Sequence, residues 1–343
     1  MSSEFPHRSV GHRRARLWWR IAIAGVLLTA VVATVGLWLE VRPVGSGPSR
    51  VVAIPPGAST WQIGERLTQA GVIRSPRALV AAARLRRAGG RLRHGEYALA
   101  PTQGALEIVD VLIHGRGLLH RVTIPEGFTI RQIAEALAEA GVARADRFME
   151  LATRRGRSFA RPSMPSIDSL EGYLFPDTYH LPRSLDEEAV IGVMLDRFEA
   201  AVGPAVRDAA HARGLTLHEL VTVASMVERE AQVPAERPVI AGVIYNRLAR
   251  GMRLEIDATV LYALGRHKDR VTFADLGVDS PYNTYRRGGL PPGPIASPGL
   301  AAITAAATPA DVPYLFYVLK PDGGHHFSRT LAEHLAAVRR YRP

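Results

Sequence analysis

IPPGASTWQIGERLTQAGVI at residues 54–73 returns as IPEGFTIRQIAEALAEAGVA at residues 124–143, and this repeat decides the fold. At an offset of 70 residues, ten of the twenty positions are identical. Each copy has a short β-like run that ends in Ile-Pro, then a glycine turn, then apolar residues four apart on one helix face. The repeat therefore predicts one strand–helix unit that occurs twice, in a fold of α+β class.

The start of the helix is marked in the same way in both copies. Ser59 is followed by Gln62, and Thr129 is followed by Gln132, so a hydroxyl residue precedes glutamine by three positions each time. Such a pair forms a capping box, in which each side chain binds a backbone amide of the other residue. These local signals predict that a helix begins after each hydroxyl residue.

The residues between the two copies complete a small domain. Residues 77–87 and 106–114 have helical patterns, and residues 95–100 have the pattern of a strand. Together with the first strand–helix unit they predict a βααβ module over residues 48–118. A larger domain, in which helices alternate with short strands, is expected over residues 119–343.

An apolar segment near the N-terminus is long enough to cross a membrane. Residues 21–39, IAIAGVLLTAVVATVGLWL, carry no charge and span about 28 Å as a helix at ~1.5 Å per residue. Tryptophans lie at both ends of this segment, where aromatic residues meet the lipid headgroups. A cleaved signal peptide is the alternative, but its apolar core usually has only about 7–15 residues. A Pro/Gly/Ser-rich linker is expected to follow at residues 40–47.

Charge predicts the orientation of this segment. Residues 1–20 contain five arginines and a single acid, and basic residues are retained on the cytoplasmic side of a membrane span. We therefore expect residues 1–20 in the cytoplasm and the chain after Glu40 outside it, in the periplasm if the cell has an outer membrane. The arginines are Arg8, Arg13, Arg14, Arg16 and Arg20, and the acid is Glu4.

The helix expected over residues 217–233 carries two glutamates in an unusual setting. Its apolar positions form one stripe, and a rotation of ~100° per residue places Glu228 and Glu230 on opposite margins of that stripe. Partial burial and the negative end of the helix dipole both favour a protonated carboxyl group, which is suited to general acid catalysis near neutral pH. The pattern does not decide which glutamate is the acid, and it also fits two surface glutamates on either side of Arg229.

A second candidate region is the loop SPYNTYRRGGLPPGPIASPG at residues 280–299. Nine of its twenty residues are glycine or proline, a composition that fixes an irregular backbone. Tyr282, Asn283, Thr284 and Tyr285 supply rings and hydrogen-bonding groups of the kind that hold a sugar. An inert rigid loop is the alternative interpretation.

A third candidate region is GGHHF at residues 323–327, a turn after a strand expected at residues 314–319. No HExxH pattern is present and no carboxylate lies at ligand spacing from His325, so we expect neither a metal site nor a cofactor. The GxSxG pattern of serine hydrolases is absent. The chain has no cysteine, which excludes disulfides, a cysteine nucleophile and a lipidated cysteine.

The chain is basic, with a net charge of +11. Such a charge favours polyanionic partners such as nucleic acid, anionic lipid or an acidic polymer. The arginine-rich stretch at residues 84–93 is also typical of a solvated surface. Because no zinc-finger spacing, RNP-like aromatic run or basic heptad helix is present, nucleic acid is not expected to be a partner.

Several motifs in the same order resemble the YceG-like (MltG) family of endolytic murein transglycosylases. The resemblance covers nearly the whole chain, including the apolar segment and the doubled IP-x-G start. It departs from the family at Ala258, where proline is common, and at His326. The motifs are EGYLFPDTY (171–179), ASMVEREAQVPAER (224–237), VIYNRLARGMRLEIDATVLYALG (243–265), PYNTY with GLPPGPIASPG (281–299) and GGHHF (323–327).

The resemblance implies an N-terminal membrane helix, a small LysM-like module at residues 48–118 and a larger catalytic domain of mixed α/β structure. It also decides between the two glutamates, because the family's catalytic residue is the second glutamate of the E-x-E pattern, which is Glu230 here. Residues expected to bind or position the glycan are Glu171, Tyr282, Asn283, Tyr285 and His325.

The implied reaction is cleavage of the MurNAc–GlcNAc bond in nascent peptidoglycan strands with formation of 1,6-anhydroMurNAc ends, which would terminate strand elongation. One glutamate suffices, because the sugar's own 6-hydroxyl replaces water as the nucleophile. Glycan strands and the cytoplasmic membrane are the expected partners, and peptidoglycan synthases are further candidates. The alternatives are a non-catalytic peptidoglycan-binding or division-scaffold protein, and a hydrolase of the same bond.

Overall fold

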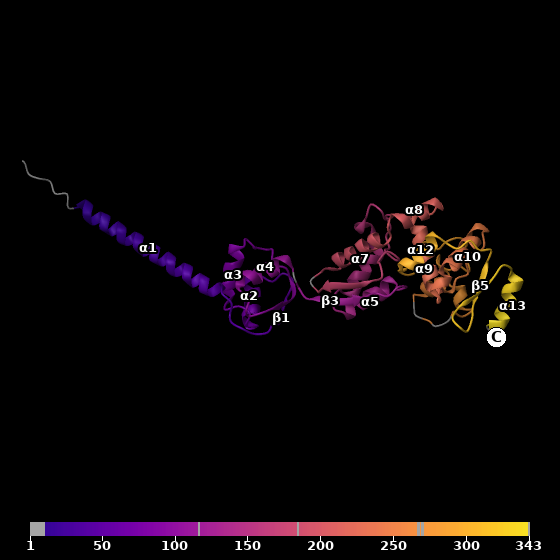
Figure 1. The fold of residues 1–343 in the computed structure, drawn as a ribbon, viewed down its shortest axis with the longest axis horizontal. Coiled ribbons are helices and arrows are strands. Elements are labelled where there is room, and N and C mark those ends of the chain that lie inside the picture. The colour runs from indigo at the N-terminus through magenta and orange to yellow at the C-terminus, as the bar shows by residue number, and fades with distance from the viewer. Residues whose placement is uncertain (1–10, 116, 184, 266–267, 269–270, 342–343) are drawn as a thin grey trace, which may run out of the picture. The chain divides into compact units, whose positions relative to one another are not determined.

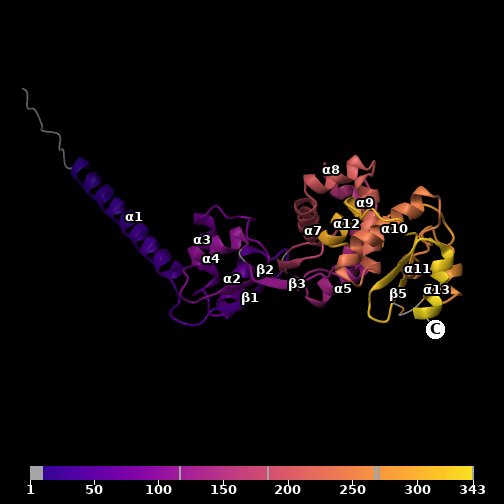
Figure 2. The same cartoon turned by 45° about the vertical axis from the view of Figure 1, so that its right-hand side comes forward.

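The structure, a computed structural model, describes residues 11–341 except 116, 184, 266–267 and 269–270. The chain forms two compact units, Met1–Leu118 and Leu119–Pro343, which Figures 1 and 2 show from two directions. Each unit has its own hydrophobic core. The described elements mix helices with short antiparallel strand pairs, as the α+β prediction requires.

The first unit begins with one long helix and continues with a small α/β domain. Strands β1 and β2 pair antiparallel, with Arg50 opposite Leu99 and Ile54 opposite Gly95. The helices bury one face each against this pair, and Leu67, Leu79 and Leu112 are fully buried. The elements are α1 (Gly11–Val41), β1 (Arg50–Ile54), α2 (Thr60–Gln69), α3 (Pro76–Leu85), β2 (Gly95–Leu99) and α4 (Ala105–His114).

Helix α1 contains the apolar segment. Its stretch Ala22–Val41 has a mean hydropathy of 2.3 and is not buried inside the protein. By length and composition this stretch is able to cross a membrane. Residues 1–10, which include Arg8, lie outside the described residues.

The second unit opens with a second copy of the same βααβ arrangement. Its strands β3 and β4 pair antiparallel as β1 and β2 do. Both predicted capping boxes are present, at the start of α2 and at the start of α5. The sequence repeat is therefore the first half of a larger structural repeat. The elements are β3 (Leu119–Thr123), α5 (Ile130–Glu139), α6 (Ala145–Arg154) and β4 (Thr178–Pro182), with a short 3-10 helix η1 (Gly156–Phe159) before β4.

The rest of the second unit is mainly helical and ends in a hairpin and a helix. The hairpin strands pair with Phe316 opposite Ser328. The elements are α7 (Glu187–Ala201), α8 (Pro204–Ala212), α9 (Leu217–Glu230), η2 (Pro234–Glu236), α10 (Arg237–Ala249), α11 (Asp257–Leu264), η3 (Asp275–Gly277), α12 (Leu300–Ala307), β5 (Phe316–Leu319), β6 (His325–Ser328) and α13 (Leu331–Tyr341).

Helix α9 lies at the centre of this unit. All eight residues from Leu220 to Val227 are buried, and α10, α11 and α12 contact the helix. It ends at Glu230, three residues before the predicted end. The reason is Pro234, because a proline disfavours helical geometry at the residue before it, and here it starts η2 instead. Glu230 is thus the last residue of a buried helix.

Candidate active site

The two glutamates near the end of α9 have different surroundings. The side chain of Glu228 is only 7% exposed, and its carboxylate pairs with Arg237 at 3.3 Å. The same carboxylate accepts a hydrogen bond from the backbone amide of Gly299 at 3.1 Å, which lies at the start of α12. Glu228 is therefore used to hold α9, α10 and α12 together.

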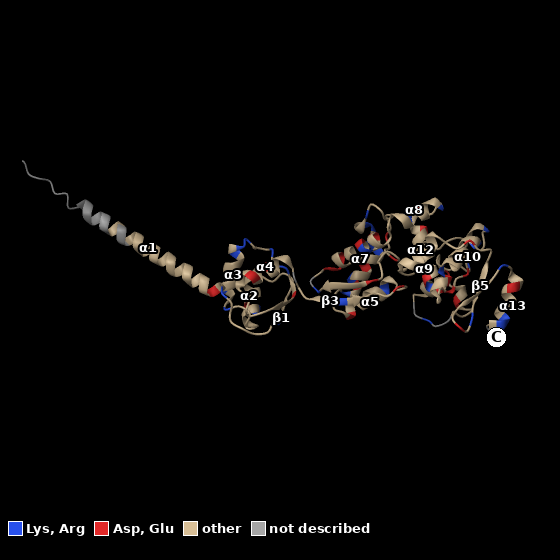
Figure 3. Cartoon of the chain, in the orientation of Figure 1, with Lys and Arg blue, Asp and Glu red and all other residues tan. Residues whose placement is uncertain are grey.

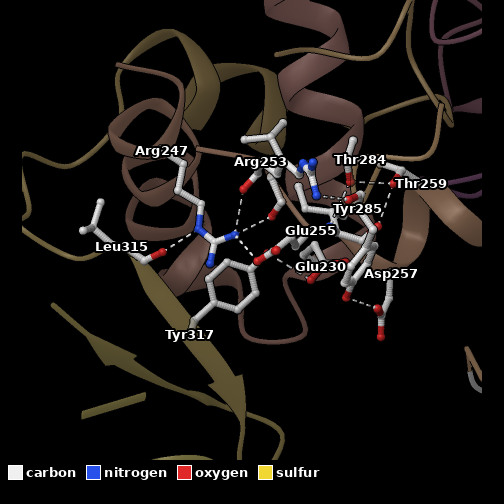
Figure 4. A network of polar contacts seen from close by, with 12 residues as sticks. Glu230, Arg247, Arg253, Glu255, Asp257, Thr259, Thr284, Tyr285, Leu315 and Tyr317 are labelled. Atoms are coloured by element: carbon white, nitrogen blue, oxygen red, sulfur yellow. Dashed lines mark hydrogen bonds and ion pairs between the residues drawn. The ribbon is translucent and has the colours of Figure 1, made fainter. Parts of the chain in front are cut away.

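Glu230 is partly buried and keeps an accessible side. The phenol of Tyr317 donates a hydrogen bond to its Oε2 atom at 3.1 Å, as Figure 4 shows. Burial, together with the nearby Asp257 carboxylate, raises the pKa of Glu230 to about 7, against the opposing effect of the hydrogen bonds from Tyr317 and the Ala258 backbone amide and of the charge of Arg229. A carboxyl group with such a pKa is able to both donate and accept a proton near neutral pH.

Tyr317 comes from the C-terminal hairpin. Burial and the neighbouring Glu230 raise its pKa well above the usual value for tyrosine, so the phenol remains a proton donor. Its ring meets the ring of His325 edge to face, with centroids 5.3 Å apart. His325 is buried, and its Nδ1 atom lies 2.7 Å from Glu236. The end of α9 and the short helix η2 therefore both contact the same hairpin, α9 through Glu230 and η2 through Glu236.

A buried arginine organises the opposite side of the site. Arg247 of α10 donates to the carbonyl oxygens of Arg253 at 3.0 Å and Leu254 at 2.9 Å, as Figure 4 shows. It also donates to the Leu315 carbonyl at 2.6 Å and to the Glu255 carboxylate at 3.1 Å. The guanidinium therefore links the start of the hairpin to the turn that precedes α11.

The Gly/Pro-rich loop packs against that turn. Thr284 accepts a hydrogen bond from the Ile256 amide at 3.0 Å and lies 2.9 Å from the Thr259 hydroxyl. Tyr285 donates to Asp257 at 2.6 Å. Asp257 is exposed, so Asp257 and Tyr285 form a polar edge beside Glu230.

Asn283 organises this loop from inside. It is fully buried, and its amide nitrogen donates to the carbonyls of Leu276 at 2.9 Å and Val278 at 2.8 Å. Its amide oxygen accepts from the backbone of Tyr285 at 3.0 Å. These contacts give Asn283 a positioning role in the loop that carries Tyr285.

Glu171, in the turn before β4, belongs to a second cluster that includes Tyr262 of α11. It is buried, and its carboxylate accepts hydrogen bonds from the Ile130 amide at 3.0 Å and from Tyr262 at 3.2 Å. Burial raises the pKa of Glu171 to about 7 against the opposing effect of these hydrogen bonds. The ring of Tyr262 contacts that of Tyr282, with centroids 4.8 Å apart.

Gly172 makes this arrangement possible. Its backbone has a φ of +84°, and a Cβ atom there would approach Pro294 to 2.5 Å and Val221 to 3.0 Å. A side chain at this position would therefore push the loop of Glu171 away from α9 and from the Gly/Pro-rich loop.

A cavity of about 640 Å³ is lined by the second cluster and reaches two neighbours of Glu230. Ala258, whose amide faces Glu230, and Tyr262, which binds Glu171, are four residues apart on α11 and both line it. Glu230 is not among the lining residues but is flanked by two that are, Arg229 and Ala258. The lining comprises Thr129, Ile130, Arg131, Gln132, Glu135, Met149, Thr153, Glu171, Arg229, Ala258, Leu261, Tyr262, Gly265, Lys268 and Ile295.

The site residues expected from the sequence thus fall into two neighbouring groups. Glu230, Tyr285 and His325 lie around the end of α9, and Glu171 and Tyr282 lie around Tyr262. Among the described residues, no group of three or more histidine, aspartate and glutamate side chains is arranged to hold a metal ion.

Sequence reasoning missed three residues that shape the site. The sequence places Tyr317 in a predicted strand, and Asp257 and Arg247 in a family motif, without giving any of the three a role in the site. For Arg247 a signal exists, because an arginine between the apolar residues Ile244 and Leu248 on one helix requires a buried polar partner. No local signal exists for Tyr317, whose contact with Glu230 spans 87 residues.

Comparisons with known proteins agree with one another. A model of the YceG-like family matches residues 52–340. The endolytic murein transglycosylase of Bacillus subtilis (strain 168) is 34% identical over 304 residues, which cover 84% of this chain and 84% of that protein. The one of Streptococcus pneumoniae serotype 2 (strain D39) is 32% identical over 83% of this chain, which spans 58% of that longer protein. A crystal structure of a yceG-like protein from Listeria monocytogenes aligns with a TM-score of 0.58 and 32% identity, over 85% of this chain and all of that one. The chain therefore belongs to the YceG-like family.

Proposed function

We propose that this protein is an endolytic murein transglycosylase, a lyase that cuts peptidoglycan strands internally. The observation that carries the proposal is Glu230, a partly buried carboxyl group with a pKa of about 7 beside a cavity of about 640 Å³. Relatives that bear this name and are 31–34% identical to the chain over the aligned residues support it.

In the proposed reaction Glu230 acts first as an acid and then as a base. Its proton passes to the glycosidic oxygen as the bond from that oxygen to C1 of MurNAc breaks, which releases the GlcNAc hydroxyl. The 6-hydroxyl of the same MurNAc then bonds to C1 and returns its proton to Glu230. The product is a 1,6-anhydro sugar, the acid is regenerated, and no water is consumed.

The other residues of the site are proposed to hold the strand or to hold Glu230. Tyr282 and Tyr285 are partly exposed and are suited to contact sugar rings. Glu171 lies on the cavity wall, where its protonated form would donate to a sugar hydroxyl. The polar atoms of Asn283 and the Nδ1 atom of His325 are already engaged, so we propose that these two act on the glycan by positioning their neighbours.

Product analysis tests this function directly. Mass spectrometry of strands cut by the full chain should find new ends in the 1,6-anhydroMurNAc form, lighter by one water than a reducing end. Reducing MurNAc ends would indicate a hydrolase instead. Binding of strands without any new ends would favour a non-catalytic scaffold protein.

Replacing Tyr317 with Phe should move the alkaline limb of the pH–rate profile upward by about one pH unit. The phenol lowers the pKa of Glu230, and a hydrogen bond to a charged group contributes about 1.5–3 kcal/mol, where one pKa unit equals about 1.4 kcal/mol. The acid must be protonated, so activity is lost as the pH rises through the pKa of Glu230. Profiles of kcat/KM for the variant and for Tyr314→Phe, which removes a phenol not bonded to Glu230, measure the shift. A limb that stays in place or moves to lower pH contradicts the assignment.

We also propose a single membrane span with the N-terminus in the cytoplasm, and with residues 48–118 and the second unit outside. Helix α1 supplies the span, and the arginines of residues 1–20 favour this orientation. A periplasmic-type reporter enzyme fused after Pro343 should be active, and a cytoplasmic-type reporter at the same place should be inactive. The reverse pattern would exclude this topology. Synthesis of new strands at the same membrane makes peptidoglycan synthases candidate partners.

Residues 48–118 of the first unit are proposed to form a LysM-like module that binds glycan. Its support is the βααβ order of residues 48–118 and a groove of about 560 Å³ along α2. Trp61, 47% exposed, lies on the same helix and offers a ring for a sugar. Trp61→Ala in the full chain should weaken binding to cell-wall sacculi several-fold and leave cleavage of short, concentrated strands unchanged. Equal loss with Leu85→Ala, on α3, would show that the effect is not specific.

A further inference from the structure

Within the first unit, the end of the apolar helix is joined to the small α/β domain by several contacts rather than by a free linker. Val41, the last residue of α1, packs against the hydrophobic core of that unit. Its carbonyl oxygen lies so close to Gly104 that a Cβ atom there would approach it to 3.1 Å. We refer to residues 40–45 as the junction.

Polar contacts hold the junction at three further points. The carboxylate of Glu40 accepts a hydrogen bond from the hydroxyl of Ser75, the N-cap of α3. Arg74 donates to the Pro43 carbonyl at 2.8 Å. The amides of Val44 and Gly45 both bind the Pro101 carbonyl, at 3.0 and 3.2 Å. The start of α3 is therefore held beside the last turn of α1, although 35 residues separate Glu40 from Ser75.

This arrangement places basic residues at the depth of lipid headgroups. The apolar stretch of α1 ends at Val41, so groups in contact with the junction lie at the membrane–water boundary. Arg42 lies in the junction, Arg74 contacts it, and Arg77 lies in the first turn of α3; all three are exposed. The guanidinium carbon of Arg42 lies 3.3 Å from the centre of the Trp38 ring, a pairing suited to the interface because tryptophan and arginine both favour that layer.

The charge of residues 40–118 fits an anionic surface. Residues 40–118 contain eleven arginines and no lysine against five acidic residues. Lysine and arginine are drawn in blue in Figure 3, where they appear on α3 near the end of α1. Anionic phospholipids attract basic residues that are held near the bilayer surface, and guanidinium groups bind phosphate with two parallel hydrogen bonds.

We infer that the junction fixes the domain at residues 48–118 at the water boundary on the outer side of the cytoplasmic membrane, and that Arg42, Arg74 and Arg77 form a binding surface for anionic phospholipid headgroups. The inference rests on the proposed membrane span. It makes the first unit a body of fixed height above the bilayer, so the catalytic unit is tethered to a defined point rather than to a flexible chain.

Site-specific fluorescence on the full chain tests this surface. The natural sequence has no cysteine, so single cysteines can be labelled without background. Arg77→Cys and Leu85→Cys, both exposed on α3, are eight residues and about 12 Å apart along the helix. With a nitroxide on the lipid headgroups, the label at position 77 should be quenched at least about twofold more than the label at position 85. Equal quenching would show a freely tethered unit and overturn the inference.

The lipid preference needs a second comparison. In mixed vesicles, the label at position 77 should be quenched more by a nitroxide carried on phosphatidylglycerol than by one carried on phosphatidylcholine at the same mole fraction, and Arg42→Gln with Arg74→Gln should remove this increment. Arg66→Gln with Arg91→Gln removes the same charge from other exposed positions and should leave the increment intact. An increment that is absent, or that both pairs abolish equally, contradicts a defined surface. Release of the protein from vesicles by alkaline carbonate would instead refute the membrane span itself.

Discussion

Glu230→Gln is expected to lower the rate of strand cleavage by about 10²–10⁴-fold, the usual contribution of a general acid or base, and toward the upper end because one group serves both proton transfers. The amide keeps the shape of the side chain and still accepts the hydrogen bond from Tyr317. Single-turnover rates with purified strands, measured with end-group analysis, give the size of the loss. Full activity of the variant would refute the proposed role of Glu230.

The stability of the Glu230→Gln variant should not fall with its activity. The raised pKa of Glu230 means that the folded protein binds this proton more tightly than the unfolded chain. That contribution to stability is complete below the unfolded pKa of about 4.3 and is lost as the pH rises through about 7. Glu230→Gln removes this loss, because glutamine does not titrate. At pH 8 the free energy of unfolding of the variant should therefore equal or exceed that of the natural protein. A folded and stable but inactive variant separates catalysis from folding.

Glu228→Gln provides the matched control. Because Glu228 is buried between Arg237 and the Gly299 amide, its loss should lower the free energy of unfolding by about 1–3 kcal/mol. Cleavage below the unfolding temperature should fall far less than in Glu230→Gln. A larger catalytic loss at Glu228 than at Glu230 would reverse the assignment of the acid.

Arg247→Met is expected to produce the largest loss of stability, about 3–5 kcal/mol, because it leaves the carbonyls of Leu315, Arg253 and Leu254 without their buried donor. At about 2–4 °C per kcal/mol for a unit of this size, the Tm should fall by roughly 6–20 °C. Calorimetry of the full chain measures this change.

The same change should also impair the site below the unfolding temperature. Arg247 links Leu315, just before the strand that carries Tyr317, to the turn that precedes Asp257 and α11, so both neighbours of Glu230 would shift. Arg247→Lys cannot reproduce the planar fork of donors and should recover only part of the stability. Arg250→Met, an exposed arginine at the end of the same helix, should change the free energy of unfolding by no more than about 0.5 kcal/mol. Equal effects at both positions would contradict the argument.

The features that the sequence allowed us to predict are those with a local cause. The capping boxes at Ser59 and Thr129 are formed by residues three positions apart, and both are present. The predicted end of α9 is three residues too late, because the apolar pattern continues past Glu230 whereas Pro234 starts η2 instead of extending the helix. The second half of the structural repeat is not predicted, because the connection between α6 and β4 contains the loop of Glu171. Strand β4 therefore does not follow β2 at the offset of 70 residues.

The candidate site divides along the same line. The helix pattern singled out Glu228 and Glu230 but could not separate them, because their difference comes from Arg237, Gly299 and Tyr317. Only Arg237 lies near the two glutamates in the chain. The loop composition singles out Tyr285, which lies near Glu230 in the structure, but it does not predict that neighbour, and the buried position of Asn283 depends on carbonyl groups that no sequence pattern records.

The contact between Glu230 and Tyr317 also sets when the enzyme becomes complete during synthesis. The sheet of the first unit closes between residues 49 positions apart, Arg50 and Leu99, early in a chain that emerges from its N-terminus. Tyr317 follows Glu230 by 87 residues, and His325 follows Glu236 by 89. Glu230 therefore obtains its hydrogen-bond donor only after the hairpin has emerged, so the sheet of the first unit is able to close in a partly made chain while the surroundings of Glu230 are still incomplete.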